Sequence, residues 1–131
     1  MVVESVLRTK EGFFVLPCDA TPSGGGGTAV HVSRDGGLTW QDAGGTIGGI
    51  HAGVAQPTDG RLMAFGRGDE YDGPPTRFFP GPRTHPTKYR PMTQSVSADM
   101  GRTWTYSEAP FPPISGGQRV AFLRLQEGPL L

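Results

Sequence analysis

The sequence contains a single cysteine, Cys18, so no disulfide can form within its 131 residues. It also lacks an excess of either charge, because 12 basic and 12 acidic residues cancel and no basic run is present. Proteins that bind nucleic acids or anionic membranes through charge show the opposite pattern. No apolar run approaches the roughly 20 residues of a membrane-spanning helix. We therefore expect no nucleic-acid partner and no membrane partner.

The first residues lack the basic start and the apolar middle of a signal peptide. If the parent protein is secreted or periplasmic, we expect its targeting segment to lie outside this chain, and the compartment stays unknown. Motifs for metals and nucleotides are also missing. His31, His51 and His85 lack metal-ligand spacing, and the glycines at 24–27 lack the Lys-Ser/Thr of a phosphate-binding loop. We expect no metal ion and no cofactor.

Helical periodicity is absent as well. Apolar residues alternate or run in short blocks, instead of recurring three and four residues apart along the chain. Glycine, with 21 residues, and proline, with 13, are both abundant, which favours many turns and short strands over helices. The aliphatic and aromatic content is adequate for a core. The composition therefore predicts an all-β domain.

A motif of the form Ser-x-Asp-x-Gly-x-Thr-Trp occurs twice, and its copies lie 64 residues apart (99 − 35). In each copy the Asp can accept hydrogen bonds from turn amides, and the Gly can adopt a positive φ. The Trp ring can cover the hairpin while its N–H finds an acceptor. We interpret the motif as a device that closes a hairpin. Its fixed residues are Ser33, Asp35, Gly37, Thr39 and Trp40, and then Ser97, Asp99, Gly101, Thr103 and Trp104.

A second repeat consists of an acidic residue followed by glycine between apolar runs, which is typical of a hairpin turn. It occurs at Glu11-Gly12, Asp59-Gly60 and Glu127-Gly128, and the flanking apolar residues coincide when the glycines are aligned. Combined with the boxed turns, this spacing predicts units of four strands. The expected strands are 2–9, 13–19, 28–33 and 38–43, then 52–57, 61–67, 92–98 and 102–107, and a last one at 119–126.

Four short antiparallel strands with these two turns correspond to one blade of a β-propeller. We predict one blade at 1–44, a second at 50–108 with a proline-rich loop at 68–91, and the start of a third at 119–131. A closed ring of six such blades would need about 300–380 residues. We therefore expect a fragment, completed by the missing blades of the same propeller, with closure by association of several chains as the alternative.

The two boxed motifs resemble the Asp-box, or BNR repeat, of the sialidase-like (neuraminidase-like) β-propeller superfamily. The resemblance implies an all-β partial β-propeller over 1–131, with two four-stranded antiparallel blades and the start of a third, from a six-bladed ring. In that family the box caps the turn between the third and fourth strands of a blade. It lies on the face away from the active site, which surrounds the central axis.

Strand alternation predicts which residues reach that opposite face. His51 and Arg119 each lie nine residues before a turn glycine, so they occupy equivalent positions at the start of a first strand. Arg67 and Asp69 leave the second strand of their unit at the same face, with Glu70 and Tyr71 just beyond. We predict that these residues converge on one rim. Arg67 and Asp69 are the catalytic candidates, and His51, Arg119, Glu70 and Tyr71 are the substrate-binding candidates.

The chemistry of that group suits an acidic sugar. An arginine offers a planar fork to a carboxylate, and a neighbouring carboxylic acid can serve as general acid or base. The resemblance implies a sialidase-like glycoside hydrolase with a Tyr nucleophile and retention of configuration. The family's Phe/Tyr-Arg-Ile-Pro motif is not found, because Tyr89-Arg90-Pro91 lacks the Ile. The alternatives are a non-catalytic Asp-box module that binds glycan or protein, and an inactive truncated product.

Overall fold

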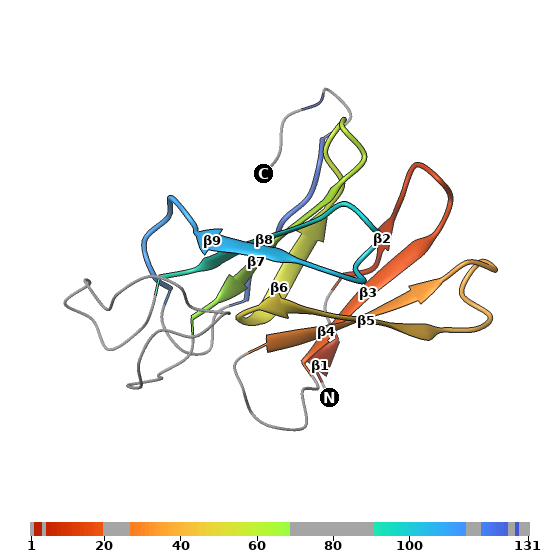
Figure 1. The fold of residues 1–131 in the computed structure, drawn as a ribbon, viewed down its shortest axis with the longest axis horizontal. Helices are drawn as coiled ribbons and strands as arrows, with labels where there is room; N and C mark the ends of the chain where they lie inside the picture. Colours follow the sequence, from red (N-terminus) through yellow and green to blue (C-terminus); the bar gives the residue numbers. More distant parts are fainter. Residues whose placement is uncertain are drawn as a thin grey trace.

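The computed structural model describes residues 2–3, 5–19, 27–68, 91–114, 119–125 and 128. Within these residues every regular element is a β-strand, so none of them forms a helix that could cross a membrane (Figure 1). The strands are β1 (Val2–Val3), β2 (Leu7–Arg8), β3 (Phe14–Asp19), β4 (Gly27–Ser33), β5 (Gln41–Gly48), β6 (Ile50–Ala55), β7 (Leu62–Arg67), β8 (Thr93–Ser97) and β9 (Thr105–Glu108).

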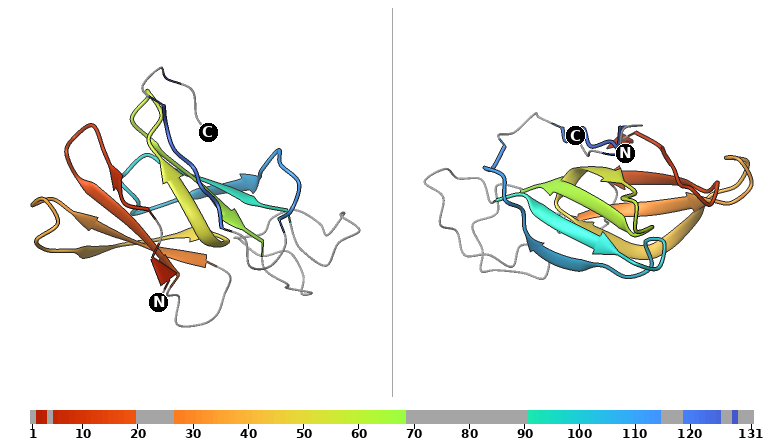
Figure 2. Two further views of the ribbon diagram at one scale, coloured as in Figure 1. Left: turned by 180° about the vertical axis from the view of Figure 1, so that it is seen from behind. Right: turned by 90° about the horizontal axis from the view of Figure 1, so that it is seen from above.

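The strands form two antiparallel sheets. In the first sheet β1 and β2 both pair with β3, which is followed by β4 and β5, so the sheet is four strands wide. The second sheet has the order β6-β7-β8-β9. Figure 2 shows the sheets side by side, and neither closes on itself among the described residues. The predictions of an all-β chain and of two four-stranded antiparallel sheets are confirmed.

Most strands lie where the turn signals predict them. β3, β4, β7 and β8 each match the expected range within one residue at either end. The expected strand at 2–9 is observed as the two short strands β1 and β2. β6 begins and ends two residues earlier than expected, and β9 begins three residues later. Residues 119–125 lie beside β6 without forming a strand of their own.

The position of β5 is the main correction to the predicted strands. The strand was expected at 38–43, but it runs from Gln41 to Gly48, because the residues before it belong to the boxed turn. It passes through a bulge at Gly44, whose φ is +88° and whose N–H donates a 2.8 Å hydrogen bond to Asp42 Oδ1. The glycines directly after the expected end of this strand therefore belong to a bulge inside it.

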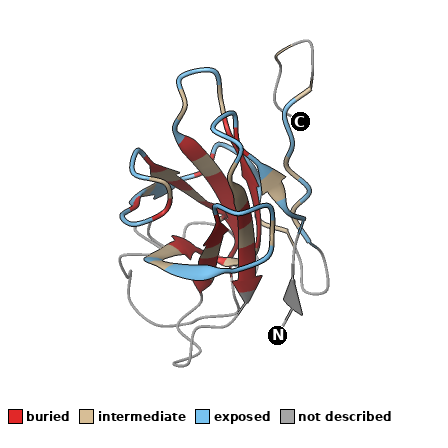
Figure 3. Cartoon of the chain, turned by 90° about the vertical axis from the view of Figure 1, so that its right-hand side faces the viewer, coloured by how far each residue is buried: buried red, intermediate tan, exposed pale blue. Residues whose placement is uncertain are grey.

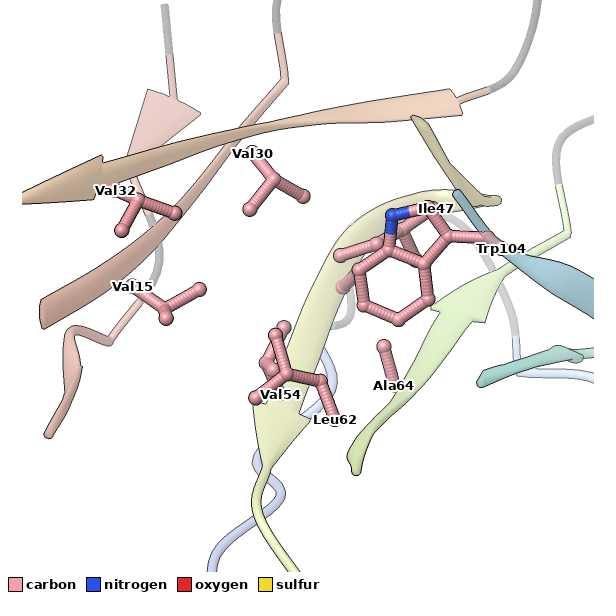
Figure 4. Close-up of a cluster of buried hydrophobic side chains, with 9 residues drawn as sticks. Val15, Val30, Val32, Ile47, Val54, Leu62, Ala64 and Trp104 are labelled. Carbon is pink, nitrogen blue, oxygen red and sulfur yellow. The ribbon is translucent and has the colours of Figure 1, made fainter. Parts of the chain in front are cut away.

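The main core lies between the two sheets (Figure 4). Burying one Val, Leu or Ile side chain in this core stabilises the folded state by about 1.5–3 kcal/mol relative to leaving it exposed. Figure 3 shows that buried residues are concentrated along the strands and exposed residues at the turns. The core contains Val15, Val30, Val32 and Ile47 from the first sheet, and Ala52, Val54, Leu62, Ala64 and Trp104 from the second.

Two glycines allow the backbones of the two sheets to come into direct contact. A Cβ added at Gly45 would lie 2.2 Å from the carbonyl oxygen of Gly101, so the second boxed turn rests directly on β5. A Cβ added at Gly66 would lie 2.0 Å from the carbonyl oxygen of Gly48, where the end of β5 crosses β7. The Tyr106 hydroxyl adds a 2.6 Å hydrogen bond to the Thr46 carbonyl. The absence of a Cβ at these two positions is what allows the sheets to pack so closely.

The second sheet carries a smaller apolar cluster away from the main core, in which Phe65, Met92 and Ala109 are buried. The ring of Phe65 meets those of Phe111 and Phe122 edge to face, with centroids 5.3 and 4.9 Å apart. Phe122 belongs to the segment 119–125, whose Val120 N–H donates to the carbonyl of His51 at 3.3 Å. This segment thus covers part of the free face of the second sheet.

Candidate functional site: the boxed turns and the opposite rim

The first boxed turn is closed by the hydrogen bonds that its sequence predicts. Asp35 Oδ1 accepts from the Thr39 N–H at 2.9 Å and from the Ser33 hydroxyl at 2.8 Å, while Oδ2 accepts from the Thr39 hydroxyl at 2.5 Å. The Gly37 N–H donates to Ser33 Oγ at 2.8 Å, and Trp40 Nε1 donates to the Gly37 carbonyl at 3.0 Å. The box is therefore a local hydrogen-bonded unit between β4 and β5.

The second boxed turn, between β8 and β9, repeats these bonds almost unchanged. Asp99 accepts from the Ser97 hydroxyl at 2.9 Å, from the Thr103 N–H at 2.9 Å and from the Thr103 hydroxyl at 2.6 Å. Trp104 Nε1 donates to the Gly101 carbonyl at 3.0 Å. Gly101 has a φ of +88°, close to the +93° of Gly37 in the first box. The prediction that the motif closes hairpins is confirmed in both copies.

These hydrogen bonds stabilise the charged form of each box carboxylate. The hydroxyl and then the backbone N–H of Thr39, followed by the Ser33 hydroxyl, lower the pKa of Asp35 from 3.8 to about 2. The hydroxyl and N–H of Thr103 lower the pKa of Asp99 to about 2 in the same way. Both aspartates are therefore ionised at neutral pH, and their role is to hold the turn.

The box carboxylates should make the fold sensitive to acid. Because their pKa is lowered on folding, their contribution is complete above about pH 4 and is lost as the pH falls towards about 2. We expect the urea midpoint of unfolding to drop across this window. The double variant Asp35→Asn/Asp99→Asn keeps the side-chain shape but cannot ionise, so its midpoint should be lower at pH 7 and vary less between pH 4 and 2. Parallel pH curves for the two proteins would contradict this assignment.

The acidic-glycine turns lie at the same end of the sheets as the boxes. The register pairs Phe14 with Ser33 and Leu62 with Ser97, next to each box. The two turns are joined by buried Gln56, whose Oε1 accepts from the Lys10 N–H at 2.8 Å. Its Nε2 donates at 3.0 Å to a carboxylate oxygen of Glu11 and at 3.0 Å to the carbonyl of Gly60.

The opposite end of the second sheet holds three of the predicted site residues. Arg67 is the last residue of β7 and pairs with Ile50, next to His51 on β6. The hydrogen bond between the Val120 N–H and the His51 carbonyl brings Arg119 to the same place. The structure thus brings His51, Arg67 and Arg119 to one rim, at the end of the strands away from the boxed turns.

The surroundings of the three rim residues differ. Arg67 is buried, with 8% of its surface exposed, whereas Arg119 is exposed and His51 is half-buried. The φ of His51 is +52°, in the left-handed region that a residue with a Cβ rarely adopts, and it lies at a bulge where the register of β6 shifts. Strained backbone of this kind is common at binding sites.

The other predicted site residues, Asp69, Glu70 and Tyr71, lie outside the described residues, as does most of the loop predicted at 68–91. The carboxylate expected beside Arg67 is therefore not placed. In the part of the chain that the structure describes, no three His, Cys, Asp or Glu side chains gather where they could hold a metal ion.

Two polar residues that support the rim were not predicted from the sequence. The Thr28 hydroxyl donates to the carbonyl of Gly49 at 2.9 Å, and Ser95 Oγ accepts from the Gly48 N–H at 3.0 Å. Both side chains are buried and lie beside the crossing of Gly48 with Gly66. The glycine pair immediately before the first residues of β6 was the available signal, since it allows such close approach.

Comparison with known proteins concerns the fold alone. No family model and no curated protein matches this chain. One similar solved structure is a protein of unknown function from Dyadobacter fermentans DSM 18053, with a TM-score of 0.63 and 19% sequence identity. The match covers 97% of this chain and 32% of that chain. The chain therefore spans about a third of the length of this neighbour.

Proposed function

We propose that this chain is part of a sialidase-like β-propeller that recognises an acidic sugar at the rim formed by His51, Arg67 and Arg119. One observation carries the proposal. Both boxed turns close a sheet at one end of the fold, and a rim with two arginines and a histidine lies at the other end. This is the arrangement that resemblance to the Asp-box superfamily implies.

Two features of the fold support the propeller. The two sheets pack face to face through one core, and the segment 119–125 follows on the free face of the second sheet, where a third unit would begin. In addition, the neighbour of unknown function contains about three times the length matched by this chain.

The rim has groups that suit a carboxylate. An arginine binds a carboxylate through two parallel N–H···O bonds, and burial strengthens such a contact because fewer water molecules screen it. Arg67 is buried and Arg119 is exposed, so one can hold the anion in the rim and the other can attract it from solvent. His51 adds a hydrogen-bonding group for a sugar hydroxyl. For hydrolysis, we assign Asp69 as acid or base, with Glu70 and Tyr71 contacting the substrate.

Replacing Arg119 with alanine in the intact protein should weaken the binding of N-acetylneuraminic acid by about 10- to 100-fold, because a hydrogen bond to a charged group contributes about 1.5–3 kcal/mol. Isothermal titration calorimetry measures this change. The matched control is Arg102→Ala, since Arg102 is also exposed but lies in the second box at the opposite end. Equal losses in both variants, or none in Arg119→Ala, would remove Arg119 from the site.

Turnover separates the enzyme from a binding module. The intact protein should release the fluorophore from a 4-methylumbelliferyl sialoside, and Asp69→Asn should abolish the release while binding is retained. Binding that depends on Arg119 without any release would assign the rim to a non-catalytic carbohydrate-binding module instead.

A further inference from the structure

A second candidate site lies at the other end of β6, close to the acidic-glycine turns. Three segments meet there: residues 5–10, the end of β6 with Gln56, and residues 122–124. They line a half-open cavity of about 450 Å³, which is within the usual range for small-molecule sites. The cavity is separate from the rim, because Gln56 lies beyond the opposite end of β6 from His51.

The charged side chains that line this cavity are all cationic. They are Arg8, Lys10 and Arg124, and no Asp or Glu is among the lining residues. The nearby carboxylate of Glu11 accepts a hydrogen bond from Gln56 Nε2, and Lys10 Nζ donates to the Thr58 carbonyl at 2.7 Å. Neither Arg8 nor Arg124 forms an ion pair with a described residue. The charged groups of the lining are therefore positive, and the carboxylates of Glu11 and Asp59 lie near Lys10 rather than near the two arginines.

The two arginines occupy equivalent positions in the repeat. Arg8 and Arg124 each lie four residues before a turn glycine, Gly12 and Gly128, and the corresponding residue of the middle unit is Gln56. Two units of the repeat thus contribute a guanidinium group to the same cavity, and the third contributes the amide that joins the turns. Arginine at both places favours an anion with two or more oxygens, such as a carboxylate or phosphate.

The rest of the wall is apolar and partly open to solvent. Val6 and Leu123 are 50% and 49% exposed, although both are large aliphatic residues. Leu7, Val54 and Phe122 complete this part of the lining. Exposed apolar side chains next to cations suit a ligand that has both an anionic group and an apolar body.

We propose that this cavity binds a small aromatic carboxylate or phosphate monoester, with the anionic group between Arg8 and Arg124 and the ring against Val6, Phe122 and Leu123. The proposal does not depend on sugar binding at the rim, since it uses none of the rim residues. The fold would then have two binding sites, one at the rim and one at the box end.

Phenyl phosphate is the probe for this site in the intact protein. We expect it to bind, and the double variant Arg8→Gln/Arg124→Gln to weaken its affinity at least about tenfold in calorimetry. The control is Arg102→Gln, which removes an exposed arginine outside the cavity and should leave the affinity unchanged. A second variant, Leu123→Asp, adds a carboxylate to the exposed wall and should abolish binding without disturbing the core.

Two further probes test the two halves of the cavity. Inorganic phosphate and phenol should each bind at least about tenfold more weakly than phenyl phosphate, because each contacts only part of the lining. Equal affinity for inorganic phosphate would overturn the role of the apolar wall. Unchanged phenyl phosphate affinity in the double variant would overturn the site itself, as would a loss caused by Arg119→Ala, because the probe would then bind at the rim.

Discussion

Replacing Trp104 with alanine is expected to lower the free energy of unfolding by about 3–5 kcal/mol. The indole lies in the core between the two sheets, with 9% of its surface exposed, and Figure 4 shows it beside Ile47 and Ala64. Its Nε1 donates to the carbonyl of Gly101, which is itself pressed against β5. Alanine would leave a cavity at the contact between the sheets and remove a bond of the box. Chemical denaturation followed by circular dichroism measures the loss.

The first box provides a matched control for this experiment. Trp40 occupies the same place in its motif and makes the same 3.0 Å hydrogen bond, but 36% of its surface is exposed. Trp40→Ala should therefore destabilise the protein by clearly less than Trp104→Ala, because it removes the local bond without opening the core. Losses of equal size would mean that the local bond, and not the packing between sheets, accounts for the effect.

Replacing Gly66 with alanine is expected to cost at least about 3 kcal/mol, at the upper end for overpacking, because the new methyl group would meet backbone that cannot rotate away. Its Cβ would lie 2.0 Å from the carbonyl oxygen of Gly48 and 2.8 Å from the Cα of Gly49. The crossing of β5 over β7 would have to open. Because Arg67 and Ile50 adjoin this crossing, binding at the rim should weaken as well. Urea denaturation and sugar titration measure the two effects.

Gly12 gives the contrasting case. A Cβ at Gly12 meets nothing within 4 Å, so Gly12→Ala adds only the strain of a positive φ of 86°, about 1–2 kcal/mol. It also lies at the box end, so sugar binding at the rim should not change. If Gly12→Ala and Gly66→Ala had the same effect on stability and binding, close packing at the crossing would not explain the loss.

The hairpins could be predicted because their signals are local. The hydrogen bonds of each box join residues two to four positions apart, so the segment from Ser33 to Trp40 is sufficient to form the first turn. Because successive strands run antiparallel, the boxes then lie at one end of the sheets and Arg67 lies at the other. The same reasoning failed for β5. The bulge at Gly44 arises in the pairing of β5 with β4, and Gly45 packs against Gly101, which is more than 50 residues away.

The candidate sites also include residues that local sequence predicts and residues that depend on packing between distant segments. Counting from the turn glycines placed His51 and Arg119 at one rim, and the backbone pairing agrees. The burial of Arg67 had no sequence signal, because it depends on how the sheets cross. The glycine pair at 48–49 was the only hint of the supporting bonds of Thr28 and Ser95, and it did not identify those two residues. The cavity between Arg8 and Arg124 was not predicted either, because it forms only where three separate segments meet.

Local sequence alone specifies most of the strands, the two boxed turns and the division between a box end and a rim end. Hydrogen bonds across a few residues form the turns, and the reversal of the chain at each hairpin separates the two ends. Packing between distant segments decides the rest. Trp40 and Trp104 have the same motif and the same hydrogen bond, yet only Trp104 is buried, because a sheet lies against the second box. Burial, cavities and close crossings are properties of pairs of segments, and a linear pattern does not contain them.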